Sequence, residues 1–413
     1  MGSLFDSHFS RGTISKDRSN SQSKLKIFRS MSQIERIRST IKNGFARAAG
    51  LLPKDDWLVV GWVLAAKVLL FVFGAKVYQV LENKRAGSLL GWLEIWNRWD
   101  AIHYLRLAEF GYTTQNVWKA WFYPFFPWSL RLVAWVTGNY FVAALIVSGA
   151  ALLVAALLLR RLVAIDFSSE VALRSVWFLL IFPTAYFLHI GYTESLFLVL
   201  AVGSVLAART QYWWLAGLMG ALAWMTRANG IVLLPTLSVE AAHQWWISKR
   251  WNWRWLYIAI VPLGFGVFLL LNWKVTGDPF TALRMRKTIS VTSVAWPWVG
   301  IRGAIGNLHR PPGDAEIVGA EELYFSLLGL VCVIASWAKL RPLYAVWMTG
   351  NYLLFNAVTF IESVPRYSLT MFPIFILFAL VAANRLWYAV ITFWSLLFLG
   401  LFTALFVRGW WAF

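Results

Sequence analysis

Residues 57–80 read WLVVGWVLAAKVLLFVFGAKVYQV, a long apolar run that Lys67 and Lys76 interrupt. A helical span of a bilayer needs about 20 mostly apolar residues, and this run is long enough. Similar runs recur along nearly all of the sequence after Leu51. Hydrophobic residues make up 59% of the chain and charged residues only 14%, whereas about a quarter of a soluble domain is charged. The sequence therefore predicts an all-α polytopic membrane protein.

About eleven transmembrane helices are expected, because further runs of suitable length and hydropathy follow the first one. They lie near residues 57–80, 139–159, 174–190, 192–208, 212–226, 229–247, 255–273, 322–338, 343–360, 366–383 and 386–407. The runs between 174 and 226 are short and are broken by Pro183 and Gly191, so half-helices that line a protein cavity are an alternative to full spans there.

The distribution of basic residues predicts the orientation of these spans. With the N-terminus inside, every connection on the cytoplasmic side carries Lys or Arg, as the positive-inside rule requires. These basic residues are Arg160, Arg161, Arg209, Lys249, Arg250, Arg254, Lys339, Arg341 and Arg385. Two long loops, about 81–138 and 274–320, then face the non-cytoplasmic side.

Residues 1–50 are expected to form a basic cytoplasmic tail, because they carry ten Lys or Arg against three acidic residues. Ser32 and Glu35 have the spacing of a capping box, and residues 32–49 place apolar and basic side chains on a helix in an amphipathic pattern. We expect this helix to lie on anionic lipid; a solvated tail with chance periodicity is the alternative. Residues 51–413 should form a single transmembrane domain.

The net charge of +19 indicates anionic membrane lipids as a partner and not nucleic acid, because the basic residues flank apolar runs and fill the tail. Common catalytic motifs are missing from the sequence: there is no phosphate-binding glycine loop, nucleophile elbow or His-Glu-x-x-His zinc motif. A single cysteine, Cys332, excludes an intrachain disulfide. No Asp-x-Asp pair typical of nucleotide-sugar transferases occurs either, so we expect no cofactor and no required metal.

The first long loop opens with a candidate site at residues 96–112, WNRWDAIHYLRLAEFGY. If this segment is helical, Asp100, His103 and Tyr104 share one face, since they are spaced i, i+3 and i+4. Other ionisable residues stand at external helix ends, namely Glu194, Arg227 and Arg366. Charged groups beside membrane spans are costly and usually have a function. The structural alternative is that the arginines only neutralise Asp100 or Glu194, or extend to lipid headgroups.

Several strings in this order resemble the PIG-V-type mannosyltransferase family. They are Arg98-Trp99-Asp100-Ala101-Ile102-His103-Tyr104, Phe122-Tyr123-Pro124-Phe125-Phe126-Pro127, Phe182-Pro183-Thr184-Ala185, Tyr192-Thr193-Glu194-Ser195-Leu196-Phe197 and Arg227-Ala228-Asn229-Gly230. The resemblance covers about residues 55–230, with Pro365-Arg366-Tyr367 as a weaker match beyond. The family includes the enzyme that adds the second mannose of the glycosylphosphatidylinositol anchor, and it has bacterial relatives. The basic tail is not part of the family pattern.

The resemblance implies a membrane glycosyltransferase of the GT-C superfamily, which uses a polyprenyl-phosphate-linked sugar on the non-cytoplasmic side. In that superfamily an acidic residue of the first external loop is commonly the catalytic base, and Asp100 matches it by position, with Glu194 as the competitor. Arginine binds phosphate through two parallel hydrogen bonds, so Arg227 and Arg366 are expected on the donor phosphate. The basic residues Arg284, Arg286 and Lys287 compete for this role. The residues expected to contact substrate are Trp99, His103, Tyr104, Tyr192, Glu194 and Asn229.

We therefore expect a mannosyltransferase that transfers the sugar to a lipid or glycolipid acceptor. A carrier or flippase for a lipid-linked saccharide is the main alternative, because it also needs broken helices and basic pockets. Carriers commonly show two corresponding halves, and this sequence shows no such repeat. A structural scaffold is a third alternative, but it gives no reason for the external carboxylates and arginines.

Overall fold

The computed structural model describes residues 53–412 except 85–86, 115–119, 290–292 and 312–318. The described residues are mostly helical, as predicted, with one isolated antiparallel bridge between Val294 and Val358. The chain divides into two units, Met1–Leu58 and Val59–Phe413. The predicted tail helix with its capping box lies outside the described residues.

The first half of the chain forms helices up to the C-terminal end of α9. They are α2 (Lys54–Leu81), α3 (Leu89–Glu94), α4 (Asp100–Phe110), α5 (Phe125–Thr137), α6 (Tyr140–Val163), α7 (Ser169–Ile181), the 3₁₀ helix η2 (Ala185–Leu188), α8 (Glu194–Arg209) and α9 (Trp213–Trp224).

The second half continues in the same way and includes several short helices. They are η3 (Ala228–Val232), α10 (Leu233–Ser248), η4 (Trp253–Ile260), α11 (Leu263–Thr276), α12 (Thr281–Ile289), α13 (Pro297–Asn307), α14 (Glu321–Lys339), α15 (Pro342–Asn356), α16 (Val364–Tyr367), η6 (Ser368–Thr370), α17 (Pro373–Val381) and α18 (Arg385–Arg408).

Within the described residues, five helical segments are long and apolar enough to cross a membrane: Lys54–Leu81, Tyr140–Val163, Trp253–Thr276, Glu321–Lys339 and Arg385–Arg408. A sixth span is formed if Val364–Thr370 and Pro373–Val381, which meet at an angle of 86°, are counted together. The protein is thus a polytopic helical membrane protein. The expected number of eleven spans stays a prediction, because α7, α8, α9, α10 and α15 are shorter than a full span.

The interruption expected around Pro183 and Gly191 is present. Helix α7 ends at Ile181, a short 3₁₀ turn follows, and α8 begins only at Glu194. Proline lacks a backbone N–H and clashes with the preceding helical turn, so a helix cannot run through it undisturbed. Residues 182–195 are all buried, and such irregular backbone is tolerated at membrane depth when protein surrounds it.

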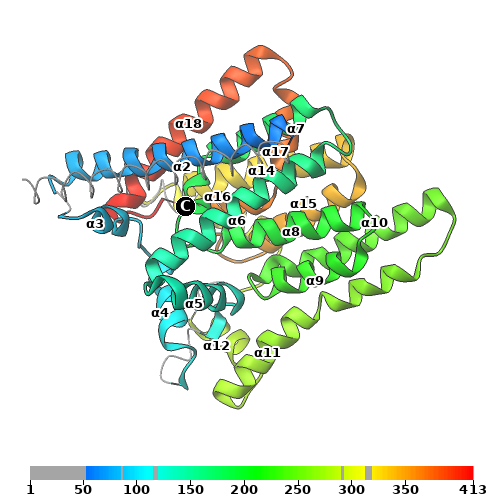
Figure 1. Ribbon diagram of the computed structural model, residues 1–413, viewed down its shortest axis with the longest axis horizontal. Helices are drawn as coiled ribbons and strands as arrows, with labels where there is room; N and C mark the ends of the chain where they lie inside the picture. The colour runs from blue at the N-terminus through cyan, green and yellow to red at the C-terminus, as the bar shows by residue number, and fades with distance from the viewer. Residues whose placement is uncertain (1–52, 85–86, 115–119, 290–292, 312–318, 413) are drawn as a thin grey trace, which may run out of the picture. The chain divides into compact units, whose positions relative to one another are not determined.

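Helix α8 is the central helix of the second unit, and it packs against α6 and α9 (Figure 1). Small side chains on α8, such as Ala201, Ser204 and Ala208, let the neighbouring backbones approach closely, as in other membrane helix bundles. An equally close approach joins α9 to α11: a Cβ on Gly264 would lie 2.0 Å from the carbonyl oxygen of Ala221. Larger residues at such positions would push the helices apart.

The two ends of α8 lie about 24 Å apart, because each of its 16 residues adds about 1.5 Å to the helix. Glu194 begins the helix and Arg209 ends it. Each of these charged residues belongs to a separate polar cluster. The cluster at Glu194 contains the residues that the sequence motifs single out.

Candidate active site

Asp100 is the first residue of α4 and follows a strained residue. Trp99, which precedes the helix, has φ +52° and ψ −124°, a conformation that costs a bulky residue about 1–3 kcal/mol. The indole of Trp99 is 38% exposed and packs edge-on against Trp411 at 5.2 Å between ring centroids. Strain of this kind is often found at functional sites. The strained residue lies directly before Asp100, which begins α4.

Arg366 connects Asp100 to Glu194. Its Nη1 donates to Asp100 Oδ2 at 2.7 Å, and its Nε donates to Glu194 Oε1 at 2.5 Å. The guanidinium lies in α16, just before the 86° bend that leads into α17. The residues around this arginine, 363–366, are buried, and Arg366 itself is only 4% exposed.

Arg227 binds the same carboxylate oxygen from the other side. Its Nη1 donates to Glu194 Oε1 at 2.5 Å and to Thr193 Oγ1 at 2.8 Å. Two arginines thus converge on Glu194, and the four charges of Asp100, Glu194, Arg227 and Arg366 balance. Buried charges are tolerated only when they are paired and hydrogen-bonded in this way. The pairings foreseen by the structural alternative are therefore present.

Aromatic rings enclose the two guanidinium groups. Arg366 lies 4.6 Å from the ring centroid of Tyr192 and 5.0 Å from that of Phe187, and Arg227 lies 5.3 Å from that of Tyr367. Such contacts favour a cation over the face of an aromatic ring. Tyr192 is itself fixed by a hydrogen bond from its hydroxyl to the Arg98 carbonyl, at 2.9 Å. These ring contacts help to fix the positions of the two guanidinium groups.

Accessibility separates the two candidate carboxylates. The side chain of Asp100 is 37% exposed, whereas that of Glu194 is fully buried. Glu194 is also engaged by two arginines at one oxygen. Solvent can therefore reach the carboxylate of Asp100 but not that of Glu194 in this conformation. Glu194 holds the two arginines, and a direct contact of Glu194 with substrate stays a prediction.

The other predicted substrate residues fall into two groups. Tyr104 packs edge-on against Phe122 and lies 6.5 Å from the Tyr192 ring, and His103 lies against Phe122 as well. Burial, together with the nearby carboxylate of Asp100, raises the pKa of the Tyr104 phenol. Tyr104 therefore stays protonated at neutral pH and cannot be the base.

Asn229 belongs to a different network, although it follows Arg227 by two residues. Its amide donates to Asn351 Oδ1 at 2.8 Å and to Thr370 Oγ1 at 3.2 Å. The side chain is 3% exposed. These contacts tie η3 to α15 and η6, so they fix the turn that carries Arg227. A direct contact of Asn229 with substrate stays a prediction.

Two residues to which the sequence reasoning assigned no role also contact this site. Thr193 accepts a hydrogen bond from Arg227, and Glu322 binds the backbone just before Arg366. The sequence could have indicated Glu322, because a carboxylate within an apolar span is costly and usually has a role. Of the competing basic run, Arg284 pairs with Asp278 and is 68% exposed, and the side chains of Arg286 and Lys287 lie outside the described residues.

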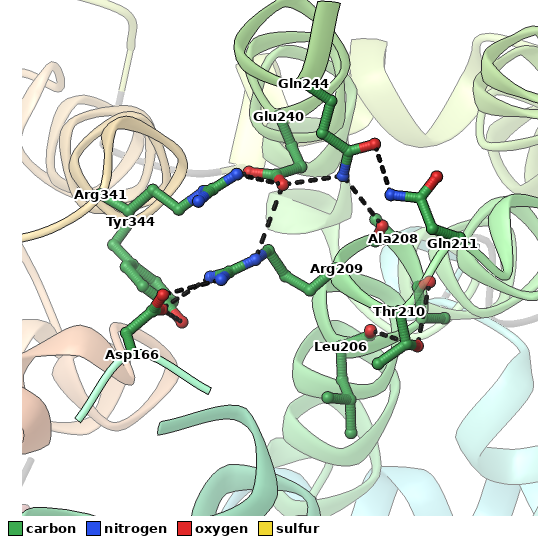
Figure 2. Close-up of polar contacts among 11 residues, drawn as sticks. Asp166, Leu206, Ala208, Arg209, Thr210, Gln211, Glu240, Gln244, Arg341 and Tyr344 are labelled. Atoms are coloured by element: carbon green, nitrogen blue, oxygen red, sulfur yellow. Dashed lines mark hydrogen bonds and ion pairs between the residues drawn. The ribbon is translucent and has the colours of Figure 1, made fainter. Parts of the chain in front are cut away.

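A second polar cluster forms at the opposite end of α8 (Figure 2). Arg209 donates through both terminal nitrogens to Asp166, at 2.6 and 2.7 Å, and Arg341 donates twice to Glu240, at 2.9 Å each. Tyr344 also donates to Asp166 at 3.2 Å. The cluster joins the α6–α7 turn, α8, α10 and the start of α15. Its carboxylates and guanidinium groups pair with one another, which is typical of a cluster that stabilises the packing of helices.

Comparisons with known proteins agree with the motifs. A family model described as mannosyltransferase (PIG-V) matches residues 80–281. Mouse (Mus musculus) GPI alpha-1,6-mannosyltransferase 2 is 32% identical over 163 residues, which are 36% of this chain and 32% of the relative. The match thus spans about a third of the relative's length. The resemblance indicated by the motifs is confirmed over residues 80–281, where the chain is similar to the PIG-V mannosyltransferase family.

Proposed function

We propose that this protein transfers mannose from a polyprenyl phosphate mannose to a lipid-linked or membrane-exposed hydroxyl on the non-cytoplasmic side of the membrane. The observation that carries the proposal is the chain of ion pairs from Asp100 through Arg366 and Glu194 to Arg227. It combines one accessible carboxylate with two arginines held for a phosphate. A donor that is already activated as a lipid phosphate needs these groups and no nucleotide pocket.

In this proposal Asp100 is the catalytic base. It takes the proton of the acceptor hydroxyl as that oxygen forms a bond to the anomeric carbon of mannose, and the bond from this carbon to the phosphate oxygen breaks. General base catalysis of this kind contributes typically about 10²–10⁴ in rate. Glu194 is the weaker candidate, because it is fully buried and holds two arginines.

The ion pair between Arg366 and Asp100 suggests an order of events. A donor phosphate that binds Arg366 competes with Asp100 for the same guanidinium, since Nη1 now donates to Asp100 Oδ2. Release of that oxygen then leaves its lone pairs available for the acceptor proton. Donor binding would therefore prepare the base before the acceptor reacts, and Arg227 with Arg366 would stabilise the departing phosphate.

The proposal is tested with the purified full chain in proteoliposomes, given labelled polyprenyl phosphate mannose and extracted membrane lipids. The expected result is a mannosylated lipid in the wild type and a loss of about a hundredfold or more in Asp100→Asn, which keeps the side chain's size but removes the base. Donor binding should persist in this variant. Glu109→Gln is the matched control, because Glu109 is exposed on the same helix and should retain full activity.

Three outcomes would contradict parts of the proposal. Transfer from a nucleotide-linked mannose, but not from the polyprenyl phosphate donor, would refute the donor assignment. Movement of the intact donor across the bilayer without any transfer would favour the carrier alternative. Full turnover in a folded Asp100→Asn protein, with Glu194→Gln inactive but still able to bind donor, would move the role of base to Glu194.

A further inference from the structure

Glu322 is a buried carboxylate that the proposed chemistry does not use. It is the second residue of α14 and is only 1% exposed. Its Oε1 accepts the backbone N–H of Ser363 at 2.6 Å, and its Oε2 accepts the backbone N–H of Val364 at 2.9 Å. Both oxygens are therefore bound to consecutive amides of a segment 41 and 42 residues further along the chain.

Those two amides lie at the start of α16, the short helix that carries Arg366. Ser363 precedes this helix with φ +62°, and its own side chain makes no capping hydrogen bond. The first N–H groups of a helix have no partner within the helix, and leaving them buried and unbonded is costly. Glu322 supplies, from another helix, the acceptors that a capping side chain would normally provide.

A second side chain also binds the backbone of this turn. Thr184 Oγ1 donates to the Pro365 carbonyl at 2.9 Å, and both groups are buried. Glu322 and Thr184 thus bind the backbone of Ser363, Val364 and Pro365, and Arg366 is the next residue. A shift of this turn would move the guanidinium away from Asp100 and Glu194 together, because one side chain reaches both carboxylates.

We propose that Glu322 is a positioning residue for the mannosyl transfer: by binding the Ser363 and Val364 amides it sets the place of Arg366 between Asp100 and Glu194. This inference rests on the function proposed above. A displacement of about 1 Å in a group far from the chemistry can reduce a rate about a hundredfold. The effect of altering Glu322 should therefore be large for turnover, although Glu322 touches no substrate.

The charge and the length of Glu322 can be tested separately. Glu322→Gln keeps the length but replaces one acceptor oxygen with an NH₂ group, which would face a backbone donor. Glu322→Asp keeps both oxygens but shortens the side chain by one methylene. Glu362→Gln is the matched control, because Glu362 is exposed and adjoins Ser363 in the chain.

The first measurement is hydrogen–deuterium exchange of the peptide that contains residues 363–366, in proteoliposomes. Exchange in this peptide should be at least about tenfold faster in Glu322→Gln than in the wild type, because a hydrogen bond to each amide slows its exchange. The control should exchange at the wild-type rate. Unchanged exchange in Glu322→Gln would overturn the proposal. If that variant cannot be purified in a folded form, the same comparison with Glu322→Asp decides.

The second measurement is mannose transfer by the same variants. We expect kcat to fall about ten- to a hundredfold in Glu322→Gln, with the acceptor KM little changed and partial recovery in Glu322→Asp. Faster exchange combined with wild-type kcat would overturn the positioning role. If the wild type itself transfers no mannose, the proposed function fails, while the exchange experiment still decides whether Glu322 holds the turn.

Discussion

Arg366 and Arg227 both carry one positive charge, but the structure gives them different geometric tasks. Arg366 uses two nitrogens, Nε and Nη1, to reach Glu194 and Asp100 separately. Arg227 reaches Glu194 and Thr193 through a single nitrogen, Nη1. Lysine keeps the charge but offers one compact ammonium group. Arg366→Lys should therefore lose a bridge that Arg227→Lys largely keeps.

The size of the difference follows from the bond that is lost. A hydrogen bond to a charged group contributes about 1.5–3 kcal/mol, and each 1.36 kcal/mol corresponds to a tenfold change in rate. Arg366→Lys should lose one of the two hydrogen bonds that this guanidinium would make to the donor phosphate, so kcat/KM should fall about ten- to a hundredfold. Arg227→Lys should reduce it by less than about tenfold, because its one donor position is preserved.

The assay is mannose transfer at limiting donor concentration in proteoliposomes, with thermal unfolding recorded for each variant. Comparable losses in Arg366→Lys and Arg227→Lys, in proteins of equal stability, would refute the argument, since they would mean that only charge matters. Full activity in both variants would instead shift the phosphate site to the run that contains Arg284, Arg286 and Lys287.

Two further predictions concern topology and stability. A cysteine placed near Ser168 should resist a membrane-impermeant reagent added outside, because residues 160–170 are predicted to be cytoplasmic; strong labelling in sealed, correctly oriented vesicles would reverse the topology. Glu240→Gln should lower the free energy of unfolding by about 3 kcal/mol, since it breaks buried pairs with Arg341 and Arg209. The control is the exposed Glu170–Arg174 pair, for which Glu170→Gln should lower the free energy of unfolding by less than about 1 kcal/mol. Equal losses of stability in Glu240→Gln and Glu170→Gln would contradict a structural role for the cluster around Glu240.

The class of the protein was predictable from sequence, because hydrophobicity and helix length are local properties. The apolar runs predicted helices, and the polar strings around Asp100, Glu194 and Arg227 indicated a resemblance that the family model confirms over residues 80–281. Proline and glycine also marked the break between α7 and α8, since their effect on the backbone acts within a turn. The number of full spans was not predictable in this way, because short helices inside a bundle are as apolar as spans.

The pairing of the charged residues depends on the tertiary structure. Asp100 and Arg366 are 266 residues apart in sequence, so only the folded chain brings them into contact. The sequence named all four charged residues but left open which carboxylate each arginine meets. Only the packing makes Asp100 accessible and buries Glu194, because burial is set by neighbours that are distant along the chain. The place of Glu322 beneath Arg366 depends on packing for the same reason.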